Sequence, residues 1–194
     1  WEVLTYKQNN SYTPSCYTLF SALTSGVFFA YLTNSMAILT QYFSLTQFEF
    51  CLVFGCGGLC AMTGTLLSKR LMSVMAPMRI ASYGNWILIV LLSVVWMSSL
   101  FYQVKLEGVL FTLFVSVLVA GGIRTMVAGV YMTFFERFSG AAASLHSTII
   151  FLFGGSIGAL AAMLSDGSLT PIFGIMLLSS LGARAVLWSM TLDN

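Results

Sequence analysis

Two side chains that can carry a positive charge lie inside long apolar stretches of this sequence. Arg124 occurs in Val-Ala-Gly-Gly-Ile-Arg-Thr-Met at 119–126, and His146 occurs in Ala-Ser-Leu-His-Ser-Thr at 143–148. A guanidinium in apolar surroundings is costly unless it faces a polar cavity or a partner. Imidazole titrates close to neutral pH, so His146 could carry a proton. A neutral histidine that is hydrogen-bonded between two helices is an equally good interpretation.

Tyr31 and Asn34 form a second candidate pair. They are three residues apart and therefore share one face of a helix. An amide side chain is poorly placed in an apolar environment but can hydrogen-bond in a polar cavity. We therefore predict that Arg124, His146 and this pair belong to the pathway of a solute or a proton.

The sequence gives little support for catalysis or for a metal or cofactor. Ser139 and His146 are seven residues apart, about 10 Å along a helix, which is too far for a nucleophile–base hydrogen bond. Asp166 and Asp193 are peripheral, so no pair of aspartates lies within the apolar stretches. The cysteines have neither histidine nor carboxylate beside them, as a metal site would require; they are Cys16, Cys51, Cys56 and Cys60. We expect no enzyme, no metal and no cofactor.

The composition indicates the environment of these residues. Of the 194 residues, 58% are hydrophobic and only 7% are charged. A water-soluble domain carries roughly 25% charged residues, because its surface must be hydrated. The outer surface of this chain must therefore be apolar, which predicts a protein embedded in a lipid bilayer. The formal net charge of +2 is small and scattered, so we expect no nucleic-acid partner.

Six apolar segments are long enough to cross the hydrocarbon core, which takes about 20 helical residues. They cover residues 16–41, 48–67, 78–102, 108–134, 141–164 and 171–189. We predict an all-α membrane protein with six transmembrane helices over residues 16–189. Residues 1–15 are then a cytoplasmic linker, and residues 190–194 are a cytoplasmic C-terminal tail. The chain begins with Trp1 and lacks the pattern of a signal peptide, which suggests a piece of a longer polypeptide.

Basic residues are distributed unevenly between the two sides of this arrangement. One side, which holds both termini, has Lys7, Lys69, Arg70, Arg79, Arg137 and Arg184, and the other side has Lys105. Cytoplasmic loops carry an excess of lysine and arginine. We therefore predict a multi-pass protein of the bacterial inner (plasma) membrane with both termini in the cytoplasm.

This orientation sharpens the interpretation of Arg124. It lies about ten residues, or roughly 15 Å, from the cytoplasmic end of its helix. That distance is long for a side chain that snorkels to the interface. We therefore expect Arg124 to face a cavity or another helix. His146 lies in the same cytoplasmic half, so the two residues can share one polar pocket.

Small residues indicate where helices approach closely. In lipid, van der Waals contact between helices replaces the hydrophobic driving force, and small side chains permit that contact. The second segment carries Gly55, Gly57, Gly58, Cys60, Ala61 and Gly64, and the fifth carries Gly154, Gly155, Gly158 and Ala162. We expect these two helices to pack tightly against neighbours.

Three stretches resemble the C-terminal six-helix half of a major facilitator superfamily transporter, of the bicyclomycin-resistance type of drug/proton antiporter. Residues 29–35 (FAYLTNS) and 41–50 (QYFSLTQFEF) are similar to the family's seventh helix and the outer loop after it. Residues 64–71 (GTLLSKRL) resemble a degenerate copy of the basic loop motif of each half. Residues 138–147 (FSGAAASLHS) resemble the entry to the eleventh helix.

The resemblance implies a half-bundle of two inverted three-helix repeats, with a polar cavity that faces an N-terminal six-helix half of the same transporter. It also implies alternating access and proton-coupled efflux of drugs or small organic solutes, so that the partners are lipid, protons and a small-molecule substrate. The alternatives are a self-contained six-helix channel, a homodimeric small transporter, or a membrane scaffold that transports nothing.

The predicted orientation can be tested with cysteines introduced into a cysteine-free background. Cysteines at Gln41 and Ser168 should react with a membrane-impermeant maleimide added outside intact cells. A cysteine at Ser73 should react only after the membrane is opened, because the loop next to Lys69 and Arg70 is predicted to be cytoplasmic. The opposite labelling pattern would overturn the orientation.

Overall fold

The computed structural model describes residues 14–101, 104–135, 138–165 and 168–192. Most of the predicted linker at 1–15 lies outside the described residues, as do residues 193 and 194 of the predicted tail at 190–194. Five residues named above lie outside them, namely Trp1, Lys7, Arg137, Asp166 and Asp193.

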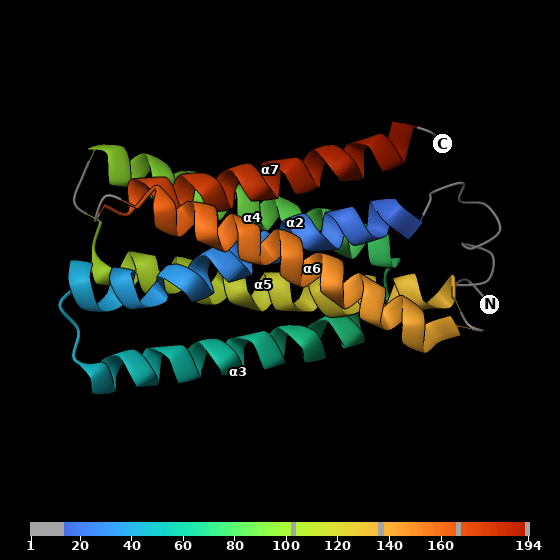
Figure 1. Cartoon of the computed structure of the whole chain (residues 1–194), viewed down its shortest axis with the longest axis horizontal. Coiled ribbons are helices and arrows are strands. Elements are labelled where there is room, and N and C mark those ends of the chain that lie inside the picture. Colours follow the sequence, from blue (N-terminus) through green and yellow to red (C-terminus); the bar gives the residue numbers. More distant parts are fainter. Residues whose placement is uncertain (1–13, 102–103, 136–137, 166–167, 193–194) are drawn as a thin grey trace.

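The described residues form six long helical spans that run side by side (Figure 1). The first is α2 (Pro14–Met36), which continues as the π-helical turn η1 (Ala37–Tyr42); the others are α3 (Gln47–Leu71), α4 (Pro77–Phe101), α5 (Leu106–Thr133), α6 (Ser139–Met163) and α7 (Thr170–Leu192). Each is long and apolar enough to cross a membrane. The prediction of an all-α multi-pass membrane protein with six spans is confirmed. The last helix extends three residues beyond the predicted end at 189.

Local sequence signals explain where the helices begin and end. The first turn of α3 is closed by a capping box, in which the Glu49 amide donates to Thr46 Oγ1 (3.3 Å) and the Thr46 amide donates to Glu49 Oε2 (2.9 Å). Basic Lys69 and Arg70 occupy its last turn, where they complement the partial negative charge of the helix C-terminus. Proline at the first position of α4, Pro77, fits a site whose amide has no partner within the helix.

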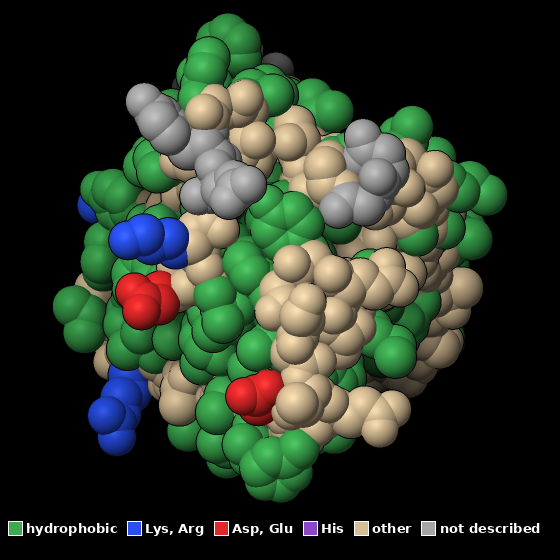
Figure 2. Space-filling model, turned by 90° about the vertical axis from the view of Figure 1, so that its left-hand side faces the viewer, with side chains coloured by type: hydrophobic (Ala, Val, Ile, Leu, Met, Phe, Trp, Pro, Cys, Tyr) green, Lys and Arg blue, Asp and Glu red, His purple; other side chains and the backbone are tan. Residues whose placement is uncertain are grey.

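Alternation of the helices places the connections at two opposite ends of the bundle. Helix α3 ends and α4 begins at the same end of the bundle at which α2 begins, α5 ends, α6 begins and α7 ends (Figure 1). Figure 2 shows the other end, where hydrophobic side chains cover much of the surface and charged ones are few. Among the described residues, Lys69, Arg70 and Arg79 belong to the first end, whereas Lys105, Glu49 and Glu107 belong to the second. Which end faces the cytoplasm stays a prediction.

Two helices, α2 and α5, form the centre of the bundle. Helix α2 packs against α5, α6 and α7, and α5 packs against α2, α3 and α4; α4 and α7 also pack together. The largest fully buried side chains in these contacts are aromatic and aliphatic, and they include Tyr17, Phe20, Leu92, Leu113, Phe173 and Met176. Helices α3 and α6 are each held mainly by one partner, α5 and α2 respectively.

Glycines make the two outer contacts possible. A Cβ at Gly64 of α3 would collide with the Leu118 carbonyl of α5, and a Cβ at Gly158 of α6 would lie 3.0 Å from the Phe29 carbonyl oxygen of α2. Backbones this close exclude any larger side chain. The expected tight packing of these glycine-bearing helices is confirmed at both positions. By contrast, a Cβ at Gly58 or Gly155 would meet nothing within 4 Å.

This difference yields a prediction for glycine-to-alanine variants of the chain. Gly64→Ala should destabilise it by about 1–3 kcal/mol, because α3 must move away from α5. Gly58→Ala, on the same helix, should be neutral or stabilise it by up to about 1 kcal/mol through helix propensity. Gly158→Ala and Gly155→Ala should repeat the contrast on α6. Unfolding in mixed micelles of increasing denaturing detergent, followed by circular dichroism, measures the difference. Equal effects within either pair would contradict the close approach.

Candidate functional site

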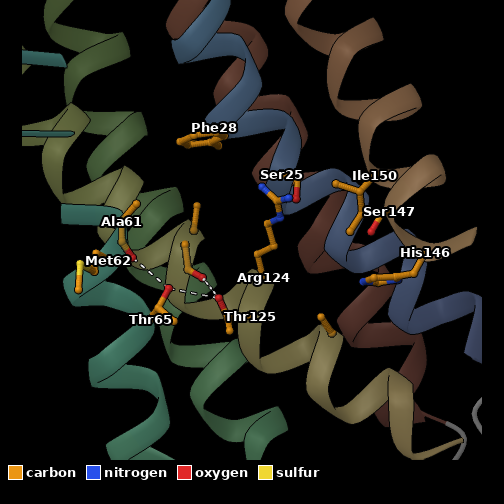
Figure 3. Close-up of a pocket in the computed structure, with 13 residues that line it drawn as sticks. Ser25, Phe28, Ala61, Met62, Thr65, Arg124, Thr125, His146, Ser147 and Ile150 are labelled. Atoms are coloured by element: carbon orange, nitrogen blue, oxygen red, sulfur yellow. Dashed lines mark hydrogen bonds between the residues drawn. The ribbon is translucent and has the colours of Figure 1, made fainter. Parts of the chain in front are cut away.

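A cavity of about 400 Å³ lies where α2, α3, α5 and α6 meet. Each helix contributes side chains to it, as Figure 3 shows. The lining is apolar in part, with Phe28, Met62 and Ile150. Its polar side chains are Ser25, Thr65, Arg124, Thr125, His146 and Ser147. The structure thus brings Arg124 and His146 to one polar cavity, as the sequence indicated; their role in transport stays a prediction.

Arg124 is the charged residue of this lining. It extends from α5 toward Ser25 on α2 (Figure 3), and its Cζ atom lies 5.7 Å from the centre of the Phe151 ring on α6. An arginine within about 6 Å of an aromatic face gains a cation–π attraction. Among the described residues, Arg124 has no hydrogen-bond or ion-pair partner. Glu107, on the same helix, is seventeen residues away, roughly 25 Å along the axis.

His146 is held in one orientation by neighbours on two helices. Its Nδ1 lies 3.3 Å from Thr18 Oγ1 on α2, and its ring stacks on Tyr131 of α5 at 4.6 Å between centres. The Thr18 hydroxyl also lies 3.2 Å from the Pro14 carbonyl, which can only accept. We therefore assign the hydroxyl proton to Pro14 and the Nδ1–H tautomer to His146, which makes Nδ1 the donor in the Thr18 contact. In the neutral ring Nε2 is then a bare acceptor. This Nε2 is buried and has no partner among the described residues.

Hydroxyl groups complete the polar lining. Ser25 is 1% exposed, and its Oγ likewise has no partner in the described part of the chain. The hydroxyls of Thr65 and Thr125 lie 3.2 Å apart and connect α3 to α5 beside the cavity. Thr125 also donates to the carbonyl of Gly121. The Thr65 hydroxyl likewise donates to the carbonyl of Ala61. The cavity therefore combines one fixed positive charge with neutral groups, among which the Ser25 hydroxyl has no acceptor in the described part of the chain.

Tyr31 and Asn34, the second predicted pair, do not line this cavity. Both are buried on the inner face of α2, so the prediction that they share a face holds. The Asn34 amide donates to the Ala30 carbonyl of its own helix (2.9 Å), which satisfies it without a cavity. The Tyr31 hydroxyl lies near Gly57 of α3, 3.5 Å from where a Cβ would be. These positions are the reason that neither residue reaches the site.

Sequence reasoning missed the cavity hydroxyls. Serine and threonine occur throughout the apolar segments, and most of them bond to a carbonyl one turn earlier in their own helix, as Thr148 and Ser156 do. The usable signal was proximity to the two ionisable residues, since Thr125 follows Arg124 and Ser147 follows His146. Within the described ranges, no group of three or more histidine, cysteine, aspartate or glutamate side chains could hold a metal ion.

Comparison with known proteins leaves the interpretation to this geometry. No protein-family model matches the sequence, and neither a curated protein nor a solved structure is detectably similar to it.

The contact between Thr18 and His146 yields a prediction about stability. Thr18→Val should cost about 1 kcal/mol, because it keeps the side-chain shape but leaves the His146 Nδ1–H group buried without an acceptor. Thr148→Val is the matched control, because that hydroxyl is on an exposed residue and donates only to its own helix. Detergent unfolding measures both variants. Equal losses for the two would contradict the assigned hydrogen bond.

Proposed function

We propose that this chain is the C-terminal half of a proton-coupled secondary transporter with the major facilitator fold. In this proposal it moves a drug or small organic solute by alternating access, and its cavity is one wall of the solute site. The observation that carries the proposal is the polar, arginine-bearing cavity within an otherwise apolar six-helix bundle.

The pattern of helix contacts supports the fold in this proposal. The six spans can be divided into two sets, α2–α4 and α5–α7, in which α2 corresponds to α5, α3 to α6 and α4 to α7. Each contact can then be compared with the contact between the corresponding helices. The α2–α6 contact then becomes α5–α3, and the α2–α7 contact becomes α5–α4, while the α2–α5 and α4–α7 contacts map onto themselves. All of these contacts are present. Because each set contains three spans, α5 runs opposite to α2. This pattern is the one expected of two inverted repeats, as in each half of a major facilitator transporter, and it supports that fold.

The position of the cavity supports a solute site. It is lined by the first two helices of each set, α2, α3, α5 and α6, whereas α4 and α7 do not contribute. Arg124 stands nine residues before the end of α5 and eighteen after its start, roughly 14 and 27 Å along the axis. Transporters of this type bind their substrate near the membrane midplane, where two bundles meet.

Exposed glycines next to the cavity support a second bundle. On α3, Gly55 lies three residues before Gly58, and Gly58 lies four residues before the cavity residue Met62. All three residues therefore share one face of the helix. On α6, Gly155 lies eight residues after the cavity residue Ser147. All three glycines are exposed and leave space beside them. Close packing against another set of helices would use such exposed glycines.

Transport assays on purified protein test the proposal. The protein encoded by the complete reading frame should show solute-dependent proton movement in proteoliposomes, read with a pH-sensitive dye over a panel of cationic, neutral and anionic solutes. The 194-residue chain alone should show none, because alternating access requires a second bundle. Robust transport by the isolated chain would refute the half-transporter proposal and favour a homodimeric transporter.

Arginine variants of the complete protein locate the site within it. Arg124→Ala should abolish coupled transport at a near-normal membrane level, and Arg124→Lys should retain part of it, because lysine keeps the charge but loses the planar fork of donors. Arg184→Lys is the matched control. Arg184 lies outside the cavity, donates to Ser82 Oγ (2.6 Å) and lies over the Trp86 ring. Normal transport by both Arg124 variants would remove that residue from the site.

A further inference from the structure

The charge of the cavity bears on the kind of solute that it accepts. We infer that it binds a small organic anion, whose carboxylate or phosphate group is held by Arg124, and that it disfavours cationic amphiphiles. As a statement about the transported substrate, this inference rests on the proposed function; as a statement about binding, it rests on the cavity alone.

The first argument is electrostatic. An arginine side chain stays protonated in proteins. No carboxylate lies among the cavity residues, and the described acidic side chains, Glu49 and Glu107, belong to the first turns of α3 and α5. Arg124 therefore brings a net positive charge to a cavity with weakly polarisable walls. A cation entering that cavity would be repelled, whereas an anion would supply the missing counter-charge.

The second argument is the set of hydrogen-bond donors. The guanidinium presents paired N–H groups in a plane, which match the two oxygens of a carboxylate or phosphate. The Ser25 hydroxyl, toward which Arg124 extends, is buried and unpartnered among the described residues, so it can donate to the same anion. His146 Nε2 is also buried and unpartnered there, and it becomes a further donor when the imidazole is protonated. Two buried polar groups and one charge are thus left for a ligand.

The third argument concerns depth and size. Arg124 lies roughly 14 Å along the axis from the nearer end of α5, a helix of 28 residues, about 42 Å, that is longer than the roughly 30 Å of hydrocarbon it would cross. Its guanidinium extends toward Ser25 on the central helix α2, so a soluble solute in the cavity is a better candidate than a lipid headgroup at the interface. The volume of about 400 Å³ falls in the range of pockets that hold small organic molecules.

Charged thiol reagents measure the potential inside the cavity, whichever solute the cavity binds. Ser147→Cys is placed in a chain whose four native cysteines are replaced, in nanodiscs of zwitterionic lipid. The modification rate is compared for sulfonatoethyl and trimethylammonioethyl methanethiosulfonate, relative to their rates with free 2-mercaptoethanol. Gln41→Cys, an exposed position at the end of the first span, is the control.

We expect the anionic reagent to modify Ser147→Cys about tenfold faster than the cationic reagent, after normalisation. At Gln41→Cys the two normalised rates should be about equal. Arg124→Gln should reduce the preference to the control value, and Arg124→Lys should keep it. If the Arg124 variants do not fold, a salt titration of the chain with Arg124 intact is the alternative test. Its preference for the anionic reagent should decrease as the ionic strength rises, because ions screen the charge. No preference, a preference for the cationic reagent, or no reaction with either would overturn the inference.

Two further experiments test separately which anion occupies the cavity and whether the complete protein transports it. Nanodiscs with phosphatidylglycerol should leave the Ser147→Cys rates unchanged; a slower reaction there would identify a lipid headgroup as the anion and overturn the soluble solute. In the transport assay of the complete protein, benzoate should be favoured over benzamide and benzylamine, three solutes of similar size. If benzylamine alone were transported, the proposed transport function would hold, but the inference that the substrate is an anion would be wrong. The cavity could also prefer the anionic reagent while the complete protein transports none of the solutes in the panel. That result would support anion binding and refute the proposed transport function.

Discussion

The bilayer leaves no water in its hydrocarbon core, so each polar group in that region must find a partner within the protein. The helices satisfy the backbone, and hydroxyl side chains facing outward donate to carbonyls of their own turn, as those of Thr33, Thr148 and Ser156 do. Some buried polar side chains have no such partner. Of the seven buried side-chain atoms that lack a partner among the described residues, Ser25 Oγ and His146 Nε2 line the cavity that also holds the unpaired Arg124. The other five, on Ser21, Thr24, Tyr31, Asn85 and Ser116, lie outside it.

Close glycine contacts determine which parts of the bundle can move relative to one another. Gly64 fixes α3 to α5, and Gly158 fixes α6 to α2, so each contact joins a helix of one three-span set to a helix of the other. The two sets are thereby interlocked across the bundle. Densely packed contacts of this kind do not deform continuously. The motion required by the proposed transport cycle must then occur between this bundle and another one, and not between its own two sets.

Length and composition were sufficient to predict the six spans, because each segment needs only enough apolar residues to cross the hydrocarbon. The direction in which each helix faces was much harder to predict. A helix that is apolar all round gives no periodic signal of its buried side. Tyr31 and Asn34 were therefore correctly placed on one face, but that face is turned into the core by the packing of α2 against three neighbours. Arg124 and His146 were found because charge in an apolar segment is itself a signal.

Two of the arginines in the described spans, Arg124 and Arg184, illustrate what sequence alone does not distinguish. Both Arg124 and Arg184 occur in apolar helices, yet their surroundings differ. The Arg184 guanidinium donates to Ser82 Oγ at 2.6 Å and lies 4.9 Å from the Trp86 ring centre, so α4 and α7 satisfy it together. Arg124 has a ring 5.7 Å away and no hydrogen-bond acceptor in the described part of the chain. An arginine satisfied by its own bundle stabilises the fold, whereas one that still needs an acceptor can bind a ligand. That difference in partners, and not the residue type, identifies Arg124 as part of the site.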